Sequence, residues 1–309
     1  MRLATIDLGT NTVRLLIVDV SPAGGWRTIV QDQRVTRLGE GLTASGRLGH
    51  APMERTALTV AEYAQRAHAA GAGAVRIVAT SAVREAANGR DFAAAVERAT
   101  GHAVEVISGD DEARLTIRGI VAGLDVSPET LLAFDIGGGS TEYILARAGR
   151  VETAVSLRLG VVPLAERYPF PARVESDRYR QMELEISDRL RGELPVALQA
   201  SGARDLVGTA GTVTTLAALD LGLTAYDATR VQGHRLSRSA IEAQRDRLGA
   251  LTQHERGALP CLEPGRADLI VPGVAIVLAS LDVTRTDGVV VSDWGLREGM
   301  MADAIDRLR

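Results

Sequence analysis

One short glycine turn occurs twice in the sequence, and this duplication constrains the fold more than any other feature. The first copy is the run LATIDLGTNT at residues 3–12, and the second is LLAFDIGGGSTE at residues 131–142. Each copy reads as an apolar strand that carries Asp7 or Asp135 near its end, a glycine turn with hydroxyl groups, and a second apolar strand. The repetition predicts two similar domains, each built on a β-hairpin.

The chemistry of these two turns indicates phosphate binding. Glycines let a backbone approach an anion closely, and exposed amides and hydroxyls can hold phosphate oxygens. The carboxylate at the strand end can hold a metal ion or orient a water molecule. Gly137, Gly138 and Gly139, followed by Ser140 and Thr141, are more than a simple turn needs, so we favour phosphate binding. Two such hairpins facing each other would form a phosphate cleft between the domains.

A third turn of this kind is the run VGTAGT at residues 207–212, which closes a strand and opens a helix. The free amides and the dipole of a helix N-terminus favour an anion at such a place. Taken alone, this run is also typical of an ordinary strand-to-helix turn. Because it is the third turn of this kind in one chain, we assign it to the same site as the first two.

Length, composition and charge limit the class of protein. A chain of 309 residues is long enough for two domains with separate cores. The formal net charge of −4 gives no global basic field for duplex nucleic acid. The sequence contains no lysine, which excludes a Schiff-base lysine and a phosphate loop of the GxxxxGK[ST] kind.

Cysteine usage and apolar runs exclude further classes. The single Cys261 excludes an internal disulfide and a cysteine-built metal site. The longest apolar run, 269–281, is too short to span a bilayer and predicts a core helix. Because Met1 and Arg2 lead directly into a strand without a signal peptide, we expect a cytoplasmic protein with no membrane partner.

The hydrophobic pattern predicts a mixed α/β organisation in both halves. We place the domains at 1–124 and 125–309, joined by a short hinge, and the last helix is free to pack back on the first domain. Strands are expected at 3–8, 13–20, 26–35, 75–79, 103–107, 131–135, 142–147, 151–157, 205–208 and 287–291. Helices are expected at 52–70, 90–99, 108–122, 175–200, 211–221, 237–250, 266–281 and 295–308.

Spacing alone leaves the roles of several charged residues undecided. Glu112 lies at a helix start and is by position typical of a solvated carboxylate interacting with the helix dipole. Arg84 follows a strand, where it either binds a phosphate or covers a helix start at the surface. Arg14 and Arg266 present the same choice.

Together these segments resemble the exopolyphosphatase and guanosine pentaphosphate phosphohydrolase (Ppx/GppA) family in its short, two-domain form. The resemblance implies the duplicated actin-like, ribonuclease H-like fold of the actin, heat-shock chaperone and sugar kinase superfamily, with a cleft between the domains. It runs in order through nearly the whole chain, and the segments are highly specific only in combination. The segments are 7–12, 79–86, 108–115, 135–142, 208–212, 266–268 and 292–299.

The resemblance also implies roles for the matching residues. Glu112 would be the general base that activates the attacking water. Asp135 and Glu142, with Asp7 as a further candidate, would hold Mg²⁺ or Mn²⁺. The phosphate-binding residues would be Asn11, Thr12, Arg84, Gly137, Gly138, Gly139, Ser140, Thr141, Gly208, Thr209, Gly211 and Thr212.

The implied activity is release of terminal phosphate from inorganic polyphosphate, by a homodimer linked to the stringent response. The alternatives are a guanosine pentaphosphate 5′-phosphohydrolase, a sugar-kinase-like phosphotransferase and a non-catalytic sensor of guanosine penta- or tetraphosphate. The low aromatic content of 3% favours polyphosphate over a nucleotide. The 108–115 segment favours hydrolysis over transfer, and the intact acidic residues argue against a sensor.

This chain departs from the family pattern in three places. Thr10 and Thr12 stand where the family usually has serines, so the hydroxyls are retained. Cys261 stands where the family often has glycine, so the resemblance does not settle the conformation of that turn. The chain of 309 residues has the short form, and we therefore expect a preference for short polyphosphates.

Overall fold

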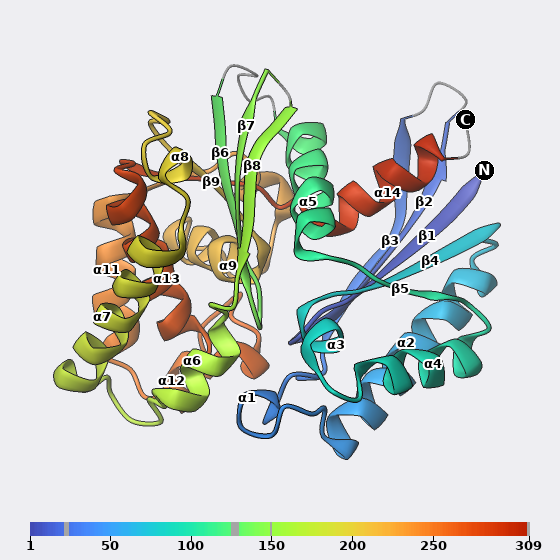
Figure 1. Ribbon diagram of the computed structural model, residues 1–309, viewed down its shortest axis with the longest axis horizontal. Coiled ribbons are helices and arrows are strands. Elements are labelled where there is room, and N and C mark those ends of the chain that lie inside the picture. The colour runs from blue at the N-terminus through green and yellow to red at the C-terminus, as the bar shows by residue number, and fades with distance from the viewer. Residues whose placement is uncertain (22–24, 125–129, 149, 308–309) are drawn as a thin grey trace. The chain divides into compact units, whose positions relative to one another are not determined.

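The computed structural model describes residues 1–21, 25–124, 130–148 and 150–307, which form two compact units (Figure 1). Unit 1 comprises Met1–Gly119 and Leu296–Arg309, and unit 2 comprises Ile120–Gly295. The division falls within helix α5 (Gly109–Gly123), and the last helix groups with unit 1. The expected boundary at 124–129 lies, except for its first residue, outside the described residues.

Unit 1 is built on a five-stranded mixed sheet in the order β3-β2-β1-β4-β5. β1 and β2 form the expected antiparallel hairpin, in which Asp7 lies opposite Arg14. β1, β4 and β5 run parallel, and Leu8, Ala79 and Val106 end them at one edge of the sheet. The strands are β1 (Arg2–Leu8), β2 (Thr12–Val20), β3 (Trp26–Val35), β4 (Ala74–Ala79) and β5 (Val104–Val106).

Alternating side chains give the unit 1 sheet two buried faces. On one face, Ile6 and Leu15 pack against α2 (His50–Ala69) and α4 (Gly89–Thr100). On the other face, Leu3 packs against Met301 of α14 (Leu296–Asp306). Helix α5 packs on this second face through Leu115, so α5 and α14 share it (Figure 1).

Unit 2 is built on a six-stranded sheet in the order β10-β11-β9-β6-β7-β8. The arrangement β8-β7-β6-β9-β11 repeats β3-β2-β1-β4-β5, with the same antiparallel meander and the same parallel partners. The expected duplicated, actin-like α/β fold is therefore confirmed. The strands are β6 (Thr130–Ile136), β7 (Thr141–Arg147), β8 (Arg150–Leu157), β9 (Leu206–Thr209), β10 (Arg235–Ser237) and β11 (Gly288–Val291).

The core of unit 2 is organised around α13 (Ile270–Thr284), in which nearly every residue is buried. This confirms the core helix expected from the apolar run. Met182 and Ile186 of α7 (Ser176–Glu193) pack into the same core, together with α9 (Ala210–Asp220) and α11 (Arg238–Gly249). Among the described residues, no helix has the length and apolar character needed to cross a membrane.

Two expected helices have different limits in the structure. The segment 175–200 forms α7 and the short α8 (Val196–Gln199), because Pro195 has no amide hydrogen and disfavours a helical conformation in the preceding residue. The expected helix at 266–281 begins only at Ile270, after a 3₁₀ turn, η1 (Pro264–Arg266). Short helices that the pattern did not predict are α1 (Leu42–Ser45), α3 (Ser81–Glu85), α6 (Val161–Arg167), α10 (Ala228–Val231) and α12 (Gln253–Gly257).

Cys261 occupies a left-handed turn position with a φ of 62°. This backbone region favours glycine, which is the residue that the family resemblance leads one to expect there. The Cys261 thiol lies 3.4 Å from the carbonyl oxygen of Leu223, and burial raises its pKa. The thiol therefore has the surroundings of a structural cysteine and not of an activated nucleophile.

Candidate phosphate and metal site

The predicted motifs follow the carboxyl ends of the parallel strands in each unit. In unit 1, β1 leads into the turn 9–12, β4 leads into α3, and β5 leads to the start of α5. In unit 2, β6 leads into the turn 137–140 and β9 leads into α9. Open α/β sheets bind ligands outside the carboxyl ends of their strands. Each unit therefore collects its candidate residues at the expected edge of its own sheet.

The first turn directs its carbonyl groups into the protein. The Gly9 amide donates to the Thr12 carbonyl at 3.1 Å and closes the turn. The Asn11 carbonyl accepts from the Thr36 amide at 2.9 Å, and the Thr10 hydroxyl accepts from a backbone amide of α3. Asn11 is 8% exposed, and its Oδ1 has no hydrogen-bond partner within the described part of the chain. A buried amide oxygen of this kind is available to a ligand or a water molecule.

The second turn has the same backbone design. The Gly137 amide donates to the Ser140 carbonyl at 2.9 Å, as Gly9 does to Thr12. The first amides of α6, from Val161 and Val162, donate to the carbonyls of Gly137 and Gly138 at 3.2 and 2.9 Å. Helix α6, which sequence reasoning missed, therefore holds the glycine turn in place.

Two amides at the tip of the second turn make no hydrogen bond within residues 130–148 and 150–307. These open amides are those of Gly138 and Gly139. Gly160 packs directly against the turn, where an added Cβ would lie 2.3 Å from the Gly138 oxygen and the Gly139 carbonyl carbon. Carbonyls that face the protein, combined with open amides, are the arrangement that binds an anion.

A pair of acidic residues lies at the base of the second hairpin. Asp135 and Glu142 are directly opposite in the antiparallel register, so their side chains lie on one face of the sheet. Glu142 is 1% exposed, and its Oε1 accepts from the hydroxyls of Ser140 at 2.7 Å and Ser156 at 2.6 Å. Like charges opposite each other are unfavourable. Carboxylate oxygens are hard ligands suited to Mg²⁺ or Mn²⁺, so this pair fits the implied metal.

Asp7, the further metal candidate, has different surroundings. It is 1% exposed and pairs with Arg14 at 3.1 Å. Burial raises its pKa, and the charge of Arg14 acts against this shift. Asp7 belongs to unit 1, whereas the acidic pair belongs to unit 2. Among the described residues, no group of three or more His, Cys, Asp or Glu side chains is arranged to hold a metal ion.

An ion pair on α14 also acts on Asp7. Arg297 and Glu298 are 8% and 4% exposed, and Arg297 Nη2 lies 2.5 Å from Glu298 Oε1. The charge of Arg297 lowers the pKa of Asp7, and that of Glu298 raises it. Both residues fall in the 292–299 segment, to which sequence reasoning gave no specific role.

Glu112 is buried, in contrast to the solvated carboxylate that its position suggested. It is 7% exposed. Arg84 Nη1 lies 3.0 Å from Glu112 Oε2 and donates to the Ile107 carbonyl at 2.9 Å. The structure therefore brings together the predicted base and one predicted phosphate ligand. The first turn of α5 is capped by Ser108, whose Oγ accepts from the Asp111 amide at 3.1 Å.

The third turn lies beside the second hairpin in the unit 2 sheet. Thr209 is the register partner of Asp135, and Gly208 is that of Phe134. The next residue, Ala210, has a left-handed φ of 69°, a backbone region that favours glycine. Thr212 is 8% exposed at the start of α9. The structure thus unites two of the three predicted turns in unit 2.

Two of the predicted phosphate-binding hydroxyls are engaged within the protein. The Ser140 hydroxyl donates to Glu142, and the Thr141 hydroxyl donates to the Leu159 carbonyl at 2.5 Å. The Ser140 hydroxyl therefore orients a candidate metal ligand. The open amides of the turn, rather than these hydroxyls, are the available donors.

Arg266, which the sequence left undecided, lies directly on the third turn. An added Cβ at Gly211 would lie 1.6 Å from Arg266 Nη1, so the glycine makes room for the guanidinium. The Arg266 side chain is 12% exposed, and its Nε lies 2.8 Å from Glu263 Oε2. A guanidinium over the first turn of α9 adds positive charge at a helix N-terminus, which is a position that favours anions. The signal in the sequence was the glycine at position 211.

Fold and site together define a duplicated, actin-like α/β protein with glycine turns suited to phosphate. The chain belongs to the Ppx/GppA phosphatase family, whose sequence model matches residues 16–308. Exopolyphosphatase 2 of Mycobacterium tuberculosis is 37% identical over 97% of both chains. A solved Ppx/GppA family member from Aquifex aeolicus is 31% identical, covers 100% of this chain and 99% of its own, and has a TM-score of 0.84. A solved exopolyphosphatase from Cytophaga hutchinsonii is 26% identical, with the same coverages and a TM-score of 0.91.

Proposed function

We propose that the protein is an exopolyphosphatase that hydrolyses the terminal phosphoanhydride bond of inorganic polyphosphate. The observation that carries the proposal is the second hairpin, where open amides of Gly138 and Gly139 adjoin the acidic pair of Asp135 and Glu142. Donors for an anion beside ligands for a cation are what a metal–phosphate substrate requires. The 37% identity to a protein named Exopolyphosphatase 2 supports polyphosphate as the substrate class.

In this proposal, the chain supplies position and charge, and water supplies the nucleophile. Phosphoryl transfer depends mainly on alignment and on neutralising charge on the phosphoryl oxygens. A Mg²⁺ or Mn²⁺ ion at Asp135 and Glu142 would supply positive charge there. Glu112 would accept a proton from the attacking water, and Arg84 orients its carboxylate through the 3.0 Å contact.

The phosphate groups would be held by backbone and arginine. We assign the terminal phosphate to the amides of the second and third turns, because these turns adjoin in the unit 2 sheet. Arg266 covers the third turn. Asn11 would contribute through its side-chain NH₂ group, because its unpartnered Oδ1 is an acceptor, as the phosphate oxygens are. We further propose a cytoplasmic homodimer that prefers short polyphosphate chains and acts without nucleic acid or membrane partners.

The test is orthophosphate release, with Mg²⁺, from short polyphosphate, long polyphosphate and guanosine pentaphosphate in parallel. We expect rapid release from short polyphosphate. Glu112→Gln should lower kcat by about 10²–10⁴-fold with little change in KM, because it removes only proton acceptance. Asp110→Asn is the matched control, because Asp110 is an exposed carboxylate in the same helical turn.

The outcomes separate the alternatives. Release only from guanosine pentaphosphate would replace the polyphosphate proposal by the nucleotide phosphohydrolase. No release from any of the three substrates would reject hydrolysis. Full activity of Glu112→Gln, with active wild type, would reject Glu112 as the base while leaving the substrate assignment intact.

A further inference from the structure

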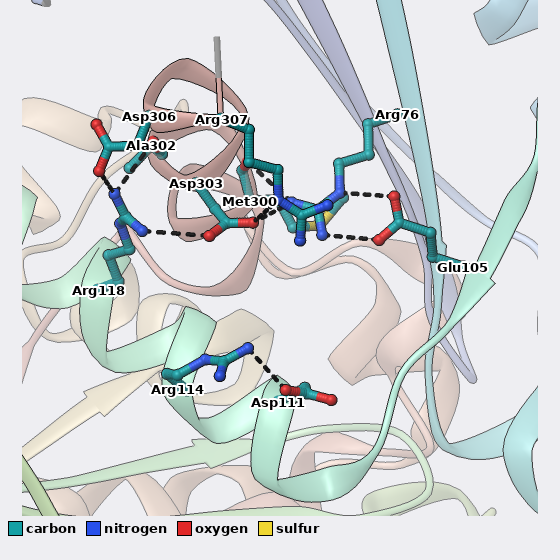
Figure 2. A network of polar contacts seen from close by, with 10 residues as sticks. All are labelled: Arg76, Glu105, Asp111, Arg114, Arg118, Met300, Ala302, Asp303, Asp306 and Arg307. Carbon is teal, nitrogen blue, oxygen red and sulfur yellow. Dashed lines mark hydrogen bonds and ion pairs between the residues drawn. The ribbon is translucent and has the colours of Figure 1, made fainter. Parts of the chain in front are cut away.

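A group of arginine and carboxylate side chains joins the last helix to the rest of unit 1 (Figure 2). The Asp303 carboxylate of α14 pairs with Arg76 at 2.9 Å, Arg118 at 3.2 Å and Arg307 at 2.9 Å. Arg76 also donates to both carboxylate oxygens of Glu105, at 2.8 and 3.0 Å. We call the set of Arg76, Glu105, Arg118 and Asp303 the Asp303 clamp.

The Asp303 clamp differs from an ordinary surface ion pair. The side chains of Arg76 and Asp303 are 11% and 20% exposed. Those of Arg118 and Glu105, at the edge of the clamp, are 35% and 39% exposed. Burial acts to lower the pKa of Arg76, but the carboxylates of Glu105 and Asp303 outweigh it and hold that pKa above its ordinary value. By contrast, the nearby pair of Arg114 and Asp111, also drawn in Figure 2, is 66% and 42% exposed. Exposed pairs contribute little, whereas shielded, multiply bonded arginines hold their geometry.

The Asp303 clamp connects elements that carry or directly precede Arg84 and Glu112. Arg76 lies on β4, which leads into α3 and Arg84. Glu105 lies on β5, which leads into α5, and α5 carries Glu112 at its start and Arg118 further along. The carboxylate of Asp303 therefore contacts β4, which leads to Arg84, and α5, which carries Glu112.

Close packing between α14 and α5 gives the clamp little freedom. An added Cβ at Gly299 would lie 1.8 Å from the Leu115 carbonyl oxygen of α5. Leu115 also packs with Met300 of α14. Because the two helices touch through their backbones, a shift of α14 must move α5 as well.

We propose that the Asp303 clamp is a positioning device for Glu112, with Asp303 as a positioning residue that never touches substrate. It fixes α14 against β4 and α5, and thereby fixes the start of α5 relative to Arg84. Glu112 must be aligned with the attacking water, and a small displacement of a reacting group lowers the rate steeply. The effect on hydrolysis rests on the proposed function, whereas the effect on α5 itself does not.

The test compares Asp303→Asn and Arg118→Gln with Arg114→Gln. The control removes an arginine from the same helix but from outside the clamp. We expect Asp303→Asn and Arg118→Gln to lower kcat for short polyphosphate by about tenfold with KM within about twofold, because the phosphate-binding turns are untouched. Amide hydrogen exchange over residues 109–119 should become faster in both variants, and Arg114→Gln should match the wild type in both measurements.

Each outcome decides a separate question. Faster exchange with lower kcat supports the clamp as a positioning device. Unchanged exchange, or a lower melting temperature with kcat retained, overturns it. If the wild type hydrolyses none of the substrates, the proposed function fails, and the exchange comparison alone still tests whether the clamp orders α5.

Discussion

The two glycine hairpins have one backbone design and opposite electrostatic characters. Both turns are closed by the same hydrogen bond, at 3.1 Å in the first and 2.9 Å in the second. In the first, Asp7 lies opposite Arg14 and pairs with it. In the second, Asp135 lies opposite Glu142. A single cross-strand position thus decides whether the hairpin neutralises its own carboxylate or presents two carboxylates on one face.

The difference suggests a division of roles between the hairpins. A carboxylate with an arginine partner is held in place without any ligand. Two carboxylates in directly opposite register repel each other, and a cation bound between them would relieve that repulsion. We therefore propose that the second hairpin holds the cation and that the first has a positioning role.

The largest effect is expected when the second hairpin is given the charges of the first. Glu142→Arg would place a positive charge where we propose a metal ligand. We expect phosphate release to fall by at least about 10³-fold, because a guanidinium next to Asp135 excludes the metal and its charge stabilisation. Arg147→Gln is the control, because Arg147 is exposed on the same strand. Retained activity in Glu142→Arg would refute the division of roles.

A smaller effect is expected from packing behind the turns. Gly160→Ala would press a methyl group against the backbone of Gly138 and Gly139 at 2.3 Å, where nothing can yield easily. Gly39→Ala would press an equally close methyl group against a side-chain carbon of Thr10, which can rotate away. We expect kcat/KM to fall about 10²-fold in Gly160→Ala and only a few-fold in Gly39→Ala. Equal losses in the two variants would show that the second turn has no special need for its backbone geometry.

The smallest effect concerns stability of the first hairpin. Arg14→Gln leaves the buried Asp7 carboxylate without its ion-pair partner, and we expect a loss of about 2 kcal/mol in the free energy of unfolding at neutral pH. Urea titrations with EDTA present would measure it. A loss below the error of the titration would mean that the Asp7–Arg14 pair does not hold this hairpin.

The pH dependence has a defined sign. The pKa of Asp7 is raised above its ordinary 3.8 in the folded protein, so the folded state binds this proton more tightly. The contribution of Asp7 to stability is therefore greatest below pH 3.8 and is lost as pH rises through the raised pKa. Arg14→Gln removes a charge that lowers this pKa and should extend the loss to higher pH. The double variant with Asp7→Asn should lack the added slope, and parallel curves would contradict the assignment.

The duplicated fold was predictable because its signals are local. Alternation and the glycine turns at Asp7 and Asp135 lie within short windows, and both hairpins form where they were expected. The break between α7 and α8 was missed by the prediction of one helix at 175–200, although its cause, Pro195, acts on its immediate neighbour. By contrast, β10 has only three residues, too few to show a periodic pattern.

The site was predictable as a set of residues but not as a set of contacts. Glu112 was named through the family resemblance, yet its burial and its pairing with Arg84 depend on two elements brought together by the sheet. Arg266 was left open because its contact with Gly211 joins segments far apart in the chain. Such contacts arise from tertiary packing, which spacing along one sequence does not encode.

Manganese binding measures whether the second hairpin holds the cation. Electron paramagnetic resonance titration would compare Mn²⁺ affinity in the wild type, Glu142→Gln and Glu152→Gln, the last being an exposed carboxylate on the neighbouring strand. We expect Glu142→Gln to weaken Mn²⁺ binding by about 10–100-fold and Glu152→Gln to bind Mn²⁺ as the wild type does. Wild-type affinity in Glu142→Gln would show that the second hairpin does not hold the cation.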